Sequence, residues 1–186
     1  MNPSQNPSAV RSKNEITDTL LHLMESVPYR EITVKQIIME SHVARKTFYR
    51  NFHSKDDVLD AYIDSIMYQY IQSLQQIEGG TFSDLLDIIL NFCMQYRKLL
   101  FILRDNKLMH LLLEKWNILI PTVHDQFAES GCVMYQSISS EQVPYVIAFT
   151  VGAVWNMIIK WIEYDMKDSP EHMKKILLQY MANLNE

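Results

Sequence analysis

The chain has 186 residues, of which 48% are hydrophobic, so it can bury a sizeable core in one domain or two small ones. It contains only four glycines and two widely separated cysteines. This composition excludes glycine-rich phosphate loops and a disulfide framework, and it disfavours an all-β fold. The net charge is −5, yet residues 29–55 carry six cations and two acids, so nucleic acid remains a partner class.

The first 14 residues are polar and lack the apolar segment of a signal peptide. Nowhere in the sequence does an uninterrupted apolar run approach the ~18 residues that a membrane span needs. We therefore expect a cytoplasmic protein without a membrane partner.

The N-terminal part of the sequence predicts a helix followed by shorter helices. Ser12 and Glu15 have the spacing of a capping box, apolar residues then recur at helical spacing, and Pro28 ends the segment. A second capping box, formed by Thr33 and Gln36, opens a short helix.

A turn at residues 42–44 separates this short helix from another, over about residues 44–51, in which Phe48 is the apolar contact. Residues 54–57 repeat the capping chemistry and begin a longer helix that runs to the Gly79-Gly80 break.

The remainder of the sequence is again helical in its periodicity. Three apolar segments predict long helices: residues 85–103, residues 108–120 before Pro121, and about residues 141–166. Ser169, Pro170 and Glu171 mark the start of a last helix, with serine as the cap and proline at the first position. The predicted fold class is all-α, with roughly eight or nine helices.

Two short helices joined by a tight turn and preceded by a helix form a helix-turn-helix unit, whose second helix enters the major groove of DNA. Residues 33–52 have this organisation, with cations at the start of the second helix, where side chains reach base edges. Later residues lie where phosphate contacts fix the register. The predicted DNA-binding residues are Thr33, Lys35, Arg45, Lys46, Thr47, Tyr49, Arg50, His53 and Lys55. The alternative is an ordinary solvated helix face.

Several residues share order, spacing and type with a known family: Thr33-Val34, Val43, Thr47-Phe48-Tyr49, Phe52, Ser54-Lys55 and Leu59. Through them, residues from about 14 to 60 resemble the DNA-binding domain of TetR-type transcriptional regulators. The resemblance implies a three-helix DNA-binding domain at residues 9–69, with its helix-turn-helix motif at 33–52. A helical regulatory and dimerisation domain then follows at residues 70–186. It also implies that Tyr49 and Lys55 contact phosphates.

Two residues depart from the family pattern. His42 stands in the turn where the family usually has glycine, and Ala44 stands where it usually has a serine cap, a loss of ~1 kcal/mol. A similar glycine-free turn is found in the subgroup that resembles dihydroxyacetone kinase regulators. The departures leave a second hypothesis open, in which a TetR-fold co-regulator with weakened DNA reading acts through a partner protein.

The C-terminal part must supply a dimer interface if two copies read a palindromic operator. Apolar and small residues at helical spacing predict this interface at Gly152, Trp155, Ile159, Ile162, Met173, Leu177 and Tyr180. The resemblance also implies a small-molecule effector pocket, for which the adaptable side chains are Phe92, Tyr96, Met109, Trp116 and Phe127. Both sets fit an ordinary buried core as well.

Catalytic chemistry has no recognisable pattern in this sequence. His110 and Glu114 share a helix face, but a metal site needs three or four ligands. A small helical enzyme would need a nucleophile–base pair or paired carboxylates, and neither occurs at such spacing. We expect no enzyme activity, no cofactor and no metal. The expected protein is a transcriptional regulator, a repressor more than an activator, whose partners are double-stranded DNA and a second copy, with a small-molecule effector left open.

Overall fold

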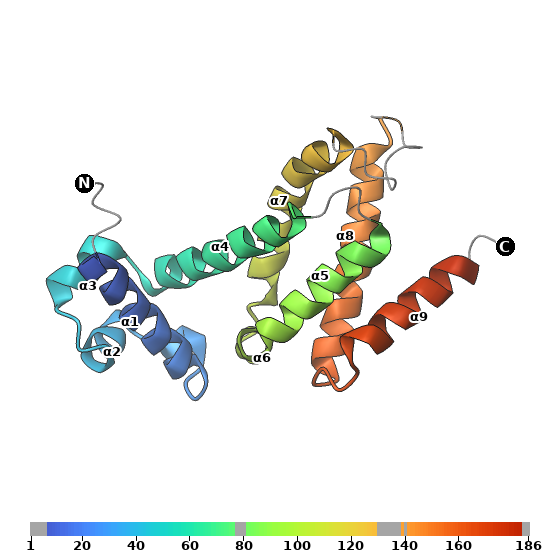
Figure 1. Ribbon diagram of the computed structural model, residues 1–186. Coiled ribbons are helices and arrows are strands. Elements are labelled where there is room, and N and C mark those ends of the chain that lie inside the picture. Colours follow the sequence, from blue (N-terminus) through green and yellow to red (C-terminus); the bar gives the residue numbers. More distant parts are fainter. Residues whose placement is uncertain (1–6, 77–80, 130–138, 140, 184–186) are drawn as a thin grey trace. The chain divides into compact units, whose positions relative to one another are not determined.

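The computed structural model describes residues 7–76, 81–129, 139 and 141–183, and within these ranges the regular structure is helical (Figure 1). The elements are α1 (Pro7–Met24), η2 (Tyr29–Glu31), α2 (Val34–Glu40), α3 (Arg45–Asn51), α4 (Lys55–Leu74), α5 (Phe82–Gln95), α6 (Arg97–Asp105), α7 (Met109–Glu129), α8 (Val143–Glu163) and α9 (Pro170–Asn183). The predicted all-α fold class is confirmed.

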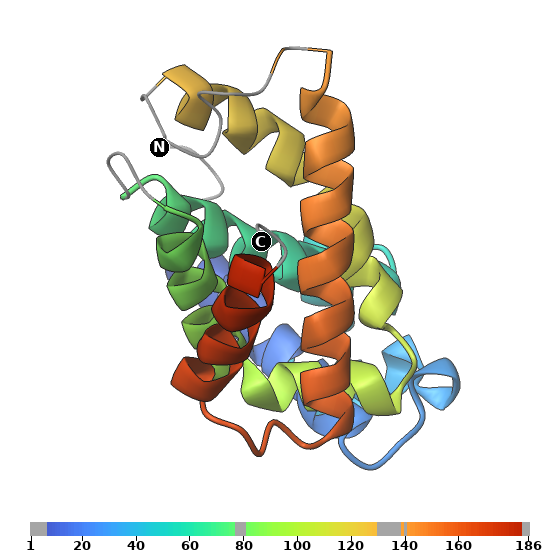
Figure 2. The same cartoon turned by 90° about the vertical axis from the view of Figure 1, so that its right-hand side faces the viewer.

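The chain divides into two compact units. The first comprises Met1–Ile66 together with Ile102–Leu108, and the second comprises Met67–Phe101 together with Met109–Glu186. The helices α4 and α6 therefore each contribute residues to both units. Within the second unit, α5 contacts α9 and α7 contacts α8, as Figures 1 and 2 show.

Three of the predicted helix starts are present as hydrogen-bonded caps. The Thr33 hydroxyl accepts from the Gln36 backbone N–H at 3.2 Å, and the Gln36 side chain accepts from the Thr33 backbone N–H at 2.8 Å. The hydroxyl of Ser54 accepts from the backbone of Asp57 at 3.0 Å. That of Ser169 accepts from the third residue after it at 3.2 Å. Local spacing alone thus defines the starts of α2, α4 and α9.

The capping box predicted at Ser12 is wrong. The helix α1 begins at Pro7, a residue type favoured at the first helical position. The Ser12 hydroxyl lies inside the helix and donates to the Ser8 carbonyl at 3.0 Å, while Glu15 pairs with Arg11 at 2.8 Å. Ser12 and Glu15 have the spacing of a capping box in the sequence, but both lie inside one continuous helix.

Two predicted helix boundaries in the second unit also differ. The apolar segment 85–103 is broken at Tyr96 and forms two helices, α5 and α6. Pro121 does not end its helix, because α7 continues through it to Glu129. Proline lacks the N–H for one backbone hydrogen bond, and the helix continues without that bond.

The helix α8 has the length and apolar composition of a membrane span and is the one such helix in the described part of the chain. Thr150, Asn156 and Lys160 interrupt its apolar residues, so the sequence shows no continuous apolar run there. Its buried residues include Ile158, Trp161 and Ile162, and the helix contacts α7. Only 22% of the apolar window is buried inside the chain, and a single helix of this kind is weak evidence for a membrane span.

Candidate nucleic-acid interface and interior pocket

The helices α2 and α3 and the turn between them form the predicted helix-turn-helix in the first unit. Phe48 of α3 is 0% exposed, and α1 contacts both short helices. His42 has φ 53°, the left-handed conformation that glycine adopts without steric cost. The turn geometry usual for glycine is therefore kept here by a histidine. The Ala44 side chain makes no cap hydrogen bond, so α3 begins without one.

The exposed face of this motif carries cations without carboxylate partners. Arg45, Lys46 and Arg50 of α3 and Lys35 of α2 are exposed, and within the described residues they form no ion pair. By contrast, Arg11 pairs with Glu15 at 2.8 Å. An unneutralised positive face is the electrostatic footprint expected of a phosphate-binding surface.

The aromatic ring of Tyr49 lies beside these cations on the outer face of α3. Tyr49 is exposed, and the Arg45 guanidinium carbon lies 5.5 Å from its ring centroid. Thr47 is half-buried, and its carbonyl accepts from the Asn51 side chain at 2.8 Å. The side chains of Arg45, Lys46 and Tyr49 thus remain accessible, whereas Thr47 offers a smaller surface.

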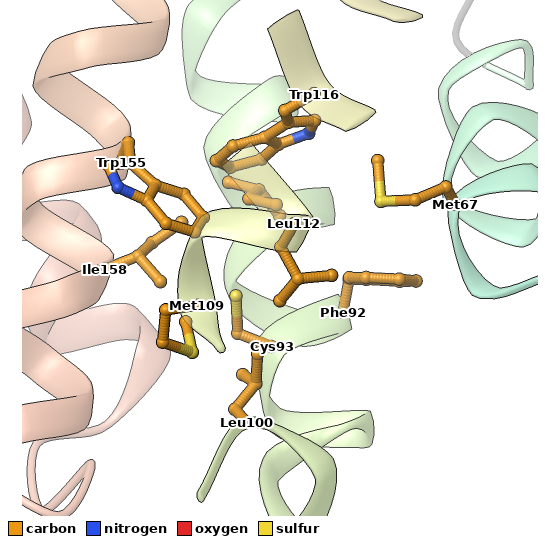
Figure 3. A pocket seen from close by; sticks show the side chains of 10 residues that line it. Met67, Phe92, Cys93, Leu100, Met109, Leu112, Trp116, Trp155 and Ile158 are labelled. Carbon is orange, nitrogen blue, oxygen red and sulfur yellow. The ribbon is translucent and has the colours of Figure 1, made fainter. Parts of the chain in front are cut away.

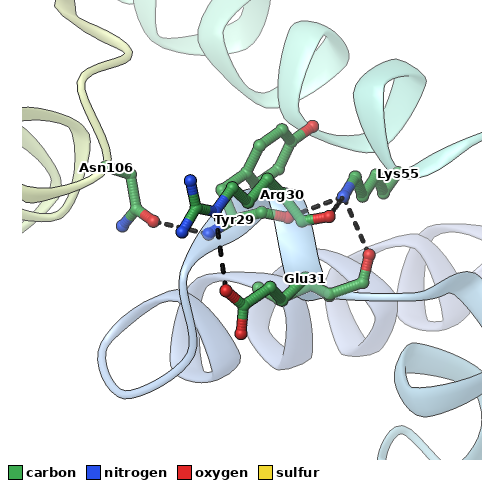
Figure 4. Close-up of polar contacts among 6 residues, drawn as sticks. Tyr29, Arg30, Glu31, Lys55 and Asn106 are labelled. Carbon is green, nitrogen blue, oxygen red and sulfur yellow. Dashed lines mark hydrogen bonds and ion pairs between the residues drawn. The ribbon is translucent and has the colours of Figure 1, made fainter.

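Lys55 has a role that the resemblance does not imply. Its ammonium donates to the carbonyl oxygens of Tyr29 at 2.6 Å, Ile32 at 2.8 Å and Arg30 at 3.3 Å (Figure 4). It also lies 4.6 Å from the centroid of the Tyr29 ring. An ammonium group has three N–H donors, and all three are used within the chain. Lys55 therefore holds η2 in this structure, and its contact with a phosphate stays a prediction.

Asn106, which follows α6, holds η2 through a hydrogen bond to Tyr29 (Figure 4) and is itself held by two others. Its side-chain oxygen accepts from the Tyr29 backbone N–H at 2.7 Å, and its amide nitrogen donates to the carbonyls of Ile102 at 2.9 Å and Met24 at 3.1 Å. The Tyr29 hydroxyl donates to Asp56. Tyr29, Lys55, Asp56 and Asn106 together are called the Tyr29 clamp below.

The environment of Tyr29 favours its neutral form. Burial and the hydrogen bond to the Asp56 carboxylate raise the pKa of the Tyr29 phenol well above its usual range. The sequence held no signal for the clamp, because Tyr29 and Asn106 are 77 residues apart. Only the folded chain brings them together.

His53 remains at the edge of the candidate interface with an exposed ring. Its backbone N–H donates to the Asp57 carboxylate at 2.8 Å, and its Nδ1 lies 3.1 Å from the same oxygen. The His53 backbone hydrogen bond is the main cause of a lowered pKa for Asp57. The ring Nε2 makes no hydrogen bond or ion pair within the described residues.

The second unit contains an apolar pocket of about 30 Å³ (Figure 3). Its lining residues come from five helices and are Met67, Ile89, Phe92, Cys93, Leu100, Met109, Leu112, Trp116, Trp155 and Ile158. Of the predicted pocket residues, Phe92, Met109 and Trp116 line it. The Phe127 side chain lies outside the described residues.

Tyr96 does not line this pocket, although it was predicted to. Its hydroxyl donates to Gln69 at 2.6 Å, and its ring lies 4.7 Å from the Phe92 ring, centroid to centroid. The hydroxyl directs the ring toward a polar partner. Met67, Ile89, Cys93, Leu100 and Leu112 were missed, because an apolar helical face in a sequence does not show which residues border a void.

The residues predicted for a dimer interface differ in exposure. Ile162 is only 1% exposed within its own chain, so it has no surface to offer a second copy. Trp155 lines the pocket, while Gly152, Ile159, Met173 and Leu177 are half-buried and Tyr180 is exposed. Tyr145 and Phe149 on α8, which were not predicted, are 79% and 76% exposed.

Comparison with known proteins assigns the family. Residues 16–62 match the family described as bacterial regulatory proteins of the tetR family, and residues 79–183 match the one described as the transcriptional regulator C-terminal region. The chain belongs to the TetR family of bacterial transcriptional regulators. Members of this family are DNA-binding regulators and not enzymes.

Individual relatives of this TetR-family chain agree with the assignment. YvkB of Bacillus subtilis, described as an uncharacterized HTH-type transcriptional regulator, is 30% identical over 77 residues, which is 41% of each chain. A putative TetR-family regulator from Syntrophomonas wolfei has TM-score 0.68 at 16% identity, covering 94% of this chain and 95% of that one. The dihydroxyacetone kinase operon activator DhaS has TM-score 0.65 at 17% identity, covering 94% and 96%. At these identities the two structures support the fold of this TetR-family chain.

Proposed function

We propose that this TetR-family regulator binds a palindromic operator as a homodimer and represses transcription from it in the cytoplasm. The observation that carries the proposal is the face of α2 and α3, where exposed cations have no carboxylate partner among the described residues. In a chain with net negative charge, such a positive face attracts phosphates to the helix that is suited to the major groove.

Within this proposal, the residues have separate roles. Arg45 and Lys46 donate to base edges, and the Thr47 methyl group meets thymine. Tyr49, Arg50 and His53 contact phosphates, as do Lys35 and the helix start at Thr33. The DNA-binding domain extends over residues 9–69, and the regulatory and dimerisation domain over residues 70–186. For Lys55, whose three donors contact carbonyls in this structure, a phosphate contact stays a prediction.

The proposed dimer interface lies on α8 and α9. The helix α9 has no fully buried residue, and its apolar side chains Ile176, Tyr180 and Met181 are exposed. On α8, Tyr145 and Phe149 are exposed, and a Cβ added at Gly152 would meet nothing within 4 Å. Such exposed apolar side chains are typical of a protein–protein interface. A second copy covers them and places two recognition helices on adjacent half-sites.

A small-molecule effector that binds in the second unit completes the proposal. It alters the affinity of the dimer for DNA only if it binds one of two conformations more tightly than the other. Since the neighbour DhaS is described as an operon activator, the sign of regulation needs its own measurement. A reporter fused to the operator should be expressed more strongly when the regulator gene is deleted.

The central test is fluorescence anisotropy of the purified protein on DNA from upstream of its own gene, at two salt concentrations and with excess competitor DNA. We expect binding that resists competitor and weakens with salt. Arg45→Ala should cost about 1–3 kcal/mol and relax sequence discrimination. The matched control is Arg11→Ala in α1, since Arg11 is also exposed but is paired with Glu15. Unchanged discrimination in the Arg45 variant would contradict its base-reading role.

A second candidate function is supported by the start of α3. Because Ala44 provides no cap and His42 occupies a left-handed turn position, the recognition helix is less stable than a capped one. In this alternative the same fold acts as a co-regulator through a partner protein. Binding that competitor abolishes on each DNA fragment near the gene would favour it.

A further inference from the structure

The segment between α3 and α4 places a histidine ring beside a carboxylate that is fixed by hydrogen bonds. The Asp57 carboxylate accepts from the His53 backbone N–H at 2.8 Å and from the Ser54 hydroxyl at 3.1 Å. The backbone N–H of Asp57 in turn donates to the Ser54 hydroxyl at 3.0 Å. The ring nitrogen Nδ1 of His53 lies 3.1 Å from the carboxylate oxygen that receives the backbone bond. Asp57 therefore fixes the edge of the His53 ring that carries Nδ1.

The same carboxylate determines which ring nitrogen of His53 carries a hydrogen. The hydrogen bond from the His53 backbone is the main cause of a lowered pKa for Asp57, so this carboxyl group is ionised where histidine changes its charge, between about pH 5 and 8. An ionised carboxylate only accepts hydrogen bonds, so Nδ1 carries a hydrogen. In the neutral ring, Nε2 then carries none.

The opposite edge of the ring, with Nε2, is open to solvent. The His53 side chain is 92% exposed, while that of Asp57 is 44% exposed. A phosphate oxygen accepts hydrogen bonds, so Nε2 can bind it only when Nε2 carries a hydrogen. With Nδ1 already protonated, this requires a second proton on the ring, which makes the ring cationic. A phosphate contact by His53 therefore requires a proton from solution.

The cations near this segment do not titrate in the same range. The ammonium of Lys55 donates to the carbonyls of Tyr29, Arg30 and Ile32, and Arg50 is exposed on α3. Histidine is the side-chain type that changes its charge between about pH 5 and 8, and lysine and arginine are not. A change of DNA affinity over this range thus reports a histidine.

We infer that Asp57 is a positioning residue for DNA binding, which holds the His53 ring so that its Nε2 donates to a backbone phosphate only in the protonated form. Asp57 acts within the proposed DNA-binding function, on which this inference rests. DNA affinity should rise as the pH falls, because the cationic ring is the form that binds. A phosphate contact carries no sequence information, so the rise should be the same on specific and unrelated DNA.

Fluorescence anisotropy of the full-length protein measures this proton linkage. The probes are DNA from upstream of its own gene and an unrelated duplex of equal length, at constant ionic strength. Affinity for both should be about tenfold higher at about pH 6 than at about pH 8, as expected for one hydrogen bond from a charged donor. His53→Gln cannot become charged and should lose most of this difference. Equal pH dependence in the parent protein and in His53→Gln would overturn the inference.

Two further histidine variants are matched controls. His22→Gln removes a histidine whose Nδ1 also faces a carboxylate, that of Glu25 at 3.7 Å, but which lies on α1 rather than on α2 or α3. His42→Asn removes the exposed histidine of the turn, where asparagine tolerates the left-handed backbone. Both variants should keep the pH dependence of the parent protein. Its loss in either control would show that another histidine is the titrating group and would overturn the inference.

Asp57→Asn tests the positioning role itself. The variant keeps an oxygen that can accept from the His53 backbone N–H, but its amide can also donate to Nδ1, which leaves the hydrogen of the neutral ring on Nε2. Binding at about pH 8 should therefore improve relative to binding at about pH 6. If Asp57 served only to cap α4, affinity would fall by the same factor at both pH values, and that result would contradict the positioning role. If Asp57→Asn does not fold, His53→Gln still tests the linkage, because its exposed ring lies outside the core.

The measurement also separates proton linkage from DNA binding as such. If the parent protein binds DNA with equal affinity at both pH values, its DNA-binding function stands and only the linkage is wrong. If it binds neither duplex at either pH, the proposed function and the linkage are both wrong.

Discussion

The Tyr29 clamp and the interior pocket differ in the forces that hold their parts. In the clamp, Lys55 and Asn106 fix η2 through hydrogen bonds of 2.6–3.3 Å to named backbone atoms. In the pocket, ten apolar side chains surround a void of about 30 Å³ without any such bond across it. Hydrogen bonds require a narrow range of distances and angles, while apolar contacts tolerate many arrangements.

This difference suits two tasks within one regulator. A recognition helix must keep a fixed position to reach base edges. Directional hydrogen bonds in the unit that carries it help to fix that position. Flexible side chains beside a void can change shape at low cost, which the proposed effector would require. Substitutions in the clamp should therefore destabilise the protein more than substitutions beside the pocket.

The largest expected effect is that of Lys55→Met, which keeps the length of the side chain but removes its three donors. The carbonyls of Tyr29 and Arg30 in η2 and that of Ile32 lose the ammonium donor, so the free energy of unfolding of the first unit should fall by about 2–4 kcal/mol. Urea denaturation and amide hydrogen exchange at residues 29–32 would measure this. The matched control is Lys46→Met on exposed α3, which should weaken DNA binding but change stability by under about 0.5 kcal/mol. Equal stability losses in the two variants would contradict the clamp.

The next largest effect is expected for Asn106→Ala. The Tyr29 backbone N–H and the Met24 carbonyl lose their side-chain partner, at a cost of about 1–3 kcal/mol. Asn91→Ala on the exposed face of α5 is the control and should be nearly neutral. Thermal unfolding of the two variants side by side checks the difference. If Asn106→Ala were also neutral, the hydrogen bonds on this side of η2 would be dispensable.

A smaller effect is expected for Met109→Leu in the pocket, because it keeps the volume and the side chain can repack beside the void. The loss in free energy of unfolding should stay below about 1.5 kcal/mol. The comparison is Met24→Leu in the first unit, where Met24 is 3% exposed and enclosed by its core. We expect Met24→Leu to lower the free energy of unfolding by more than Met109→Leu does, as measured by urea denaturation. The reverse order would show that the pocket is the more rigid of the two regions.

The smallest effect, and the one with opposite sign, is expected for Ala44→Ser. The start of α3 lacks a side-chain cap, and a serine hydroxyl can accept from the third residue of the helix. Stability should rise by about 1 kcal/mol, and operator affinity should rise if fraying of α3 limits it. Ser41→Ala, just before the turn, is a control that adds no cap. A gain in stability without a gain in affinity would show that fraying does not limit DNA binding.

Sequence reasoning succeeded where an interaction spans three or four residues. The caps at Thr33, Ser54 and Ser169 follow from spacing and residue type. The same reasoning failed at Ser12, since a serine three residues before a glutamate also fits the middle of a helix. It failed at Pro121, because surrounding contacts can keep a helix continuous through a proline.

The sequence by itself determined the all-α class, the helix-turn-helix motif and the cluster of cations on its second helix, because these depend on local periodicity and on residue type. Tertiary structure alone decided that Lys55 binds carbonyls, that Ile162 is buried inside its own chain, and that Met67 and Cys93 border the pocket. These outcomes depend on which segments meet after folding. Contacts between residues tens of positions apart leave no periodic trace in a single sequence, so only the folded chain reveals them.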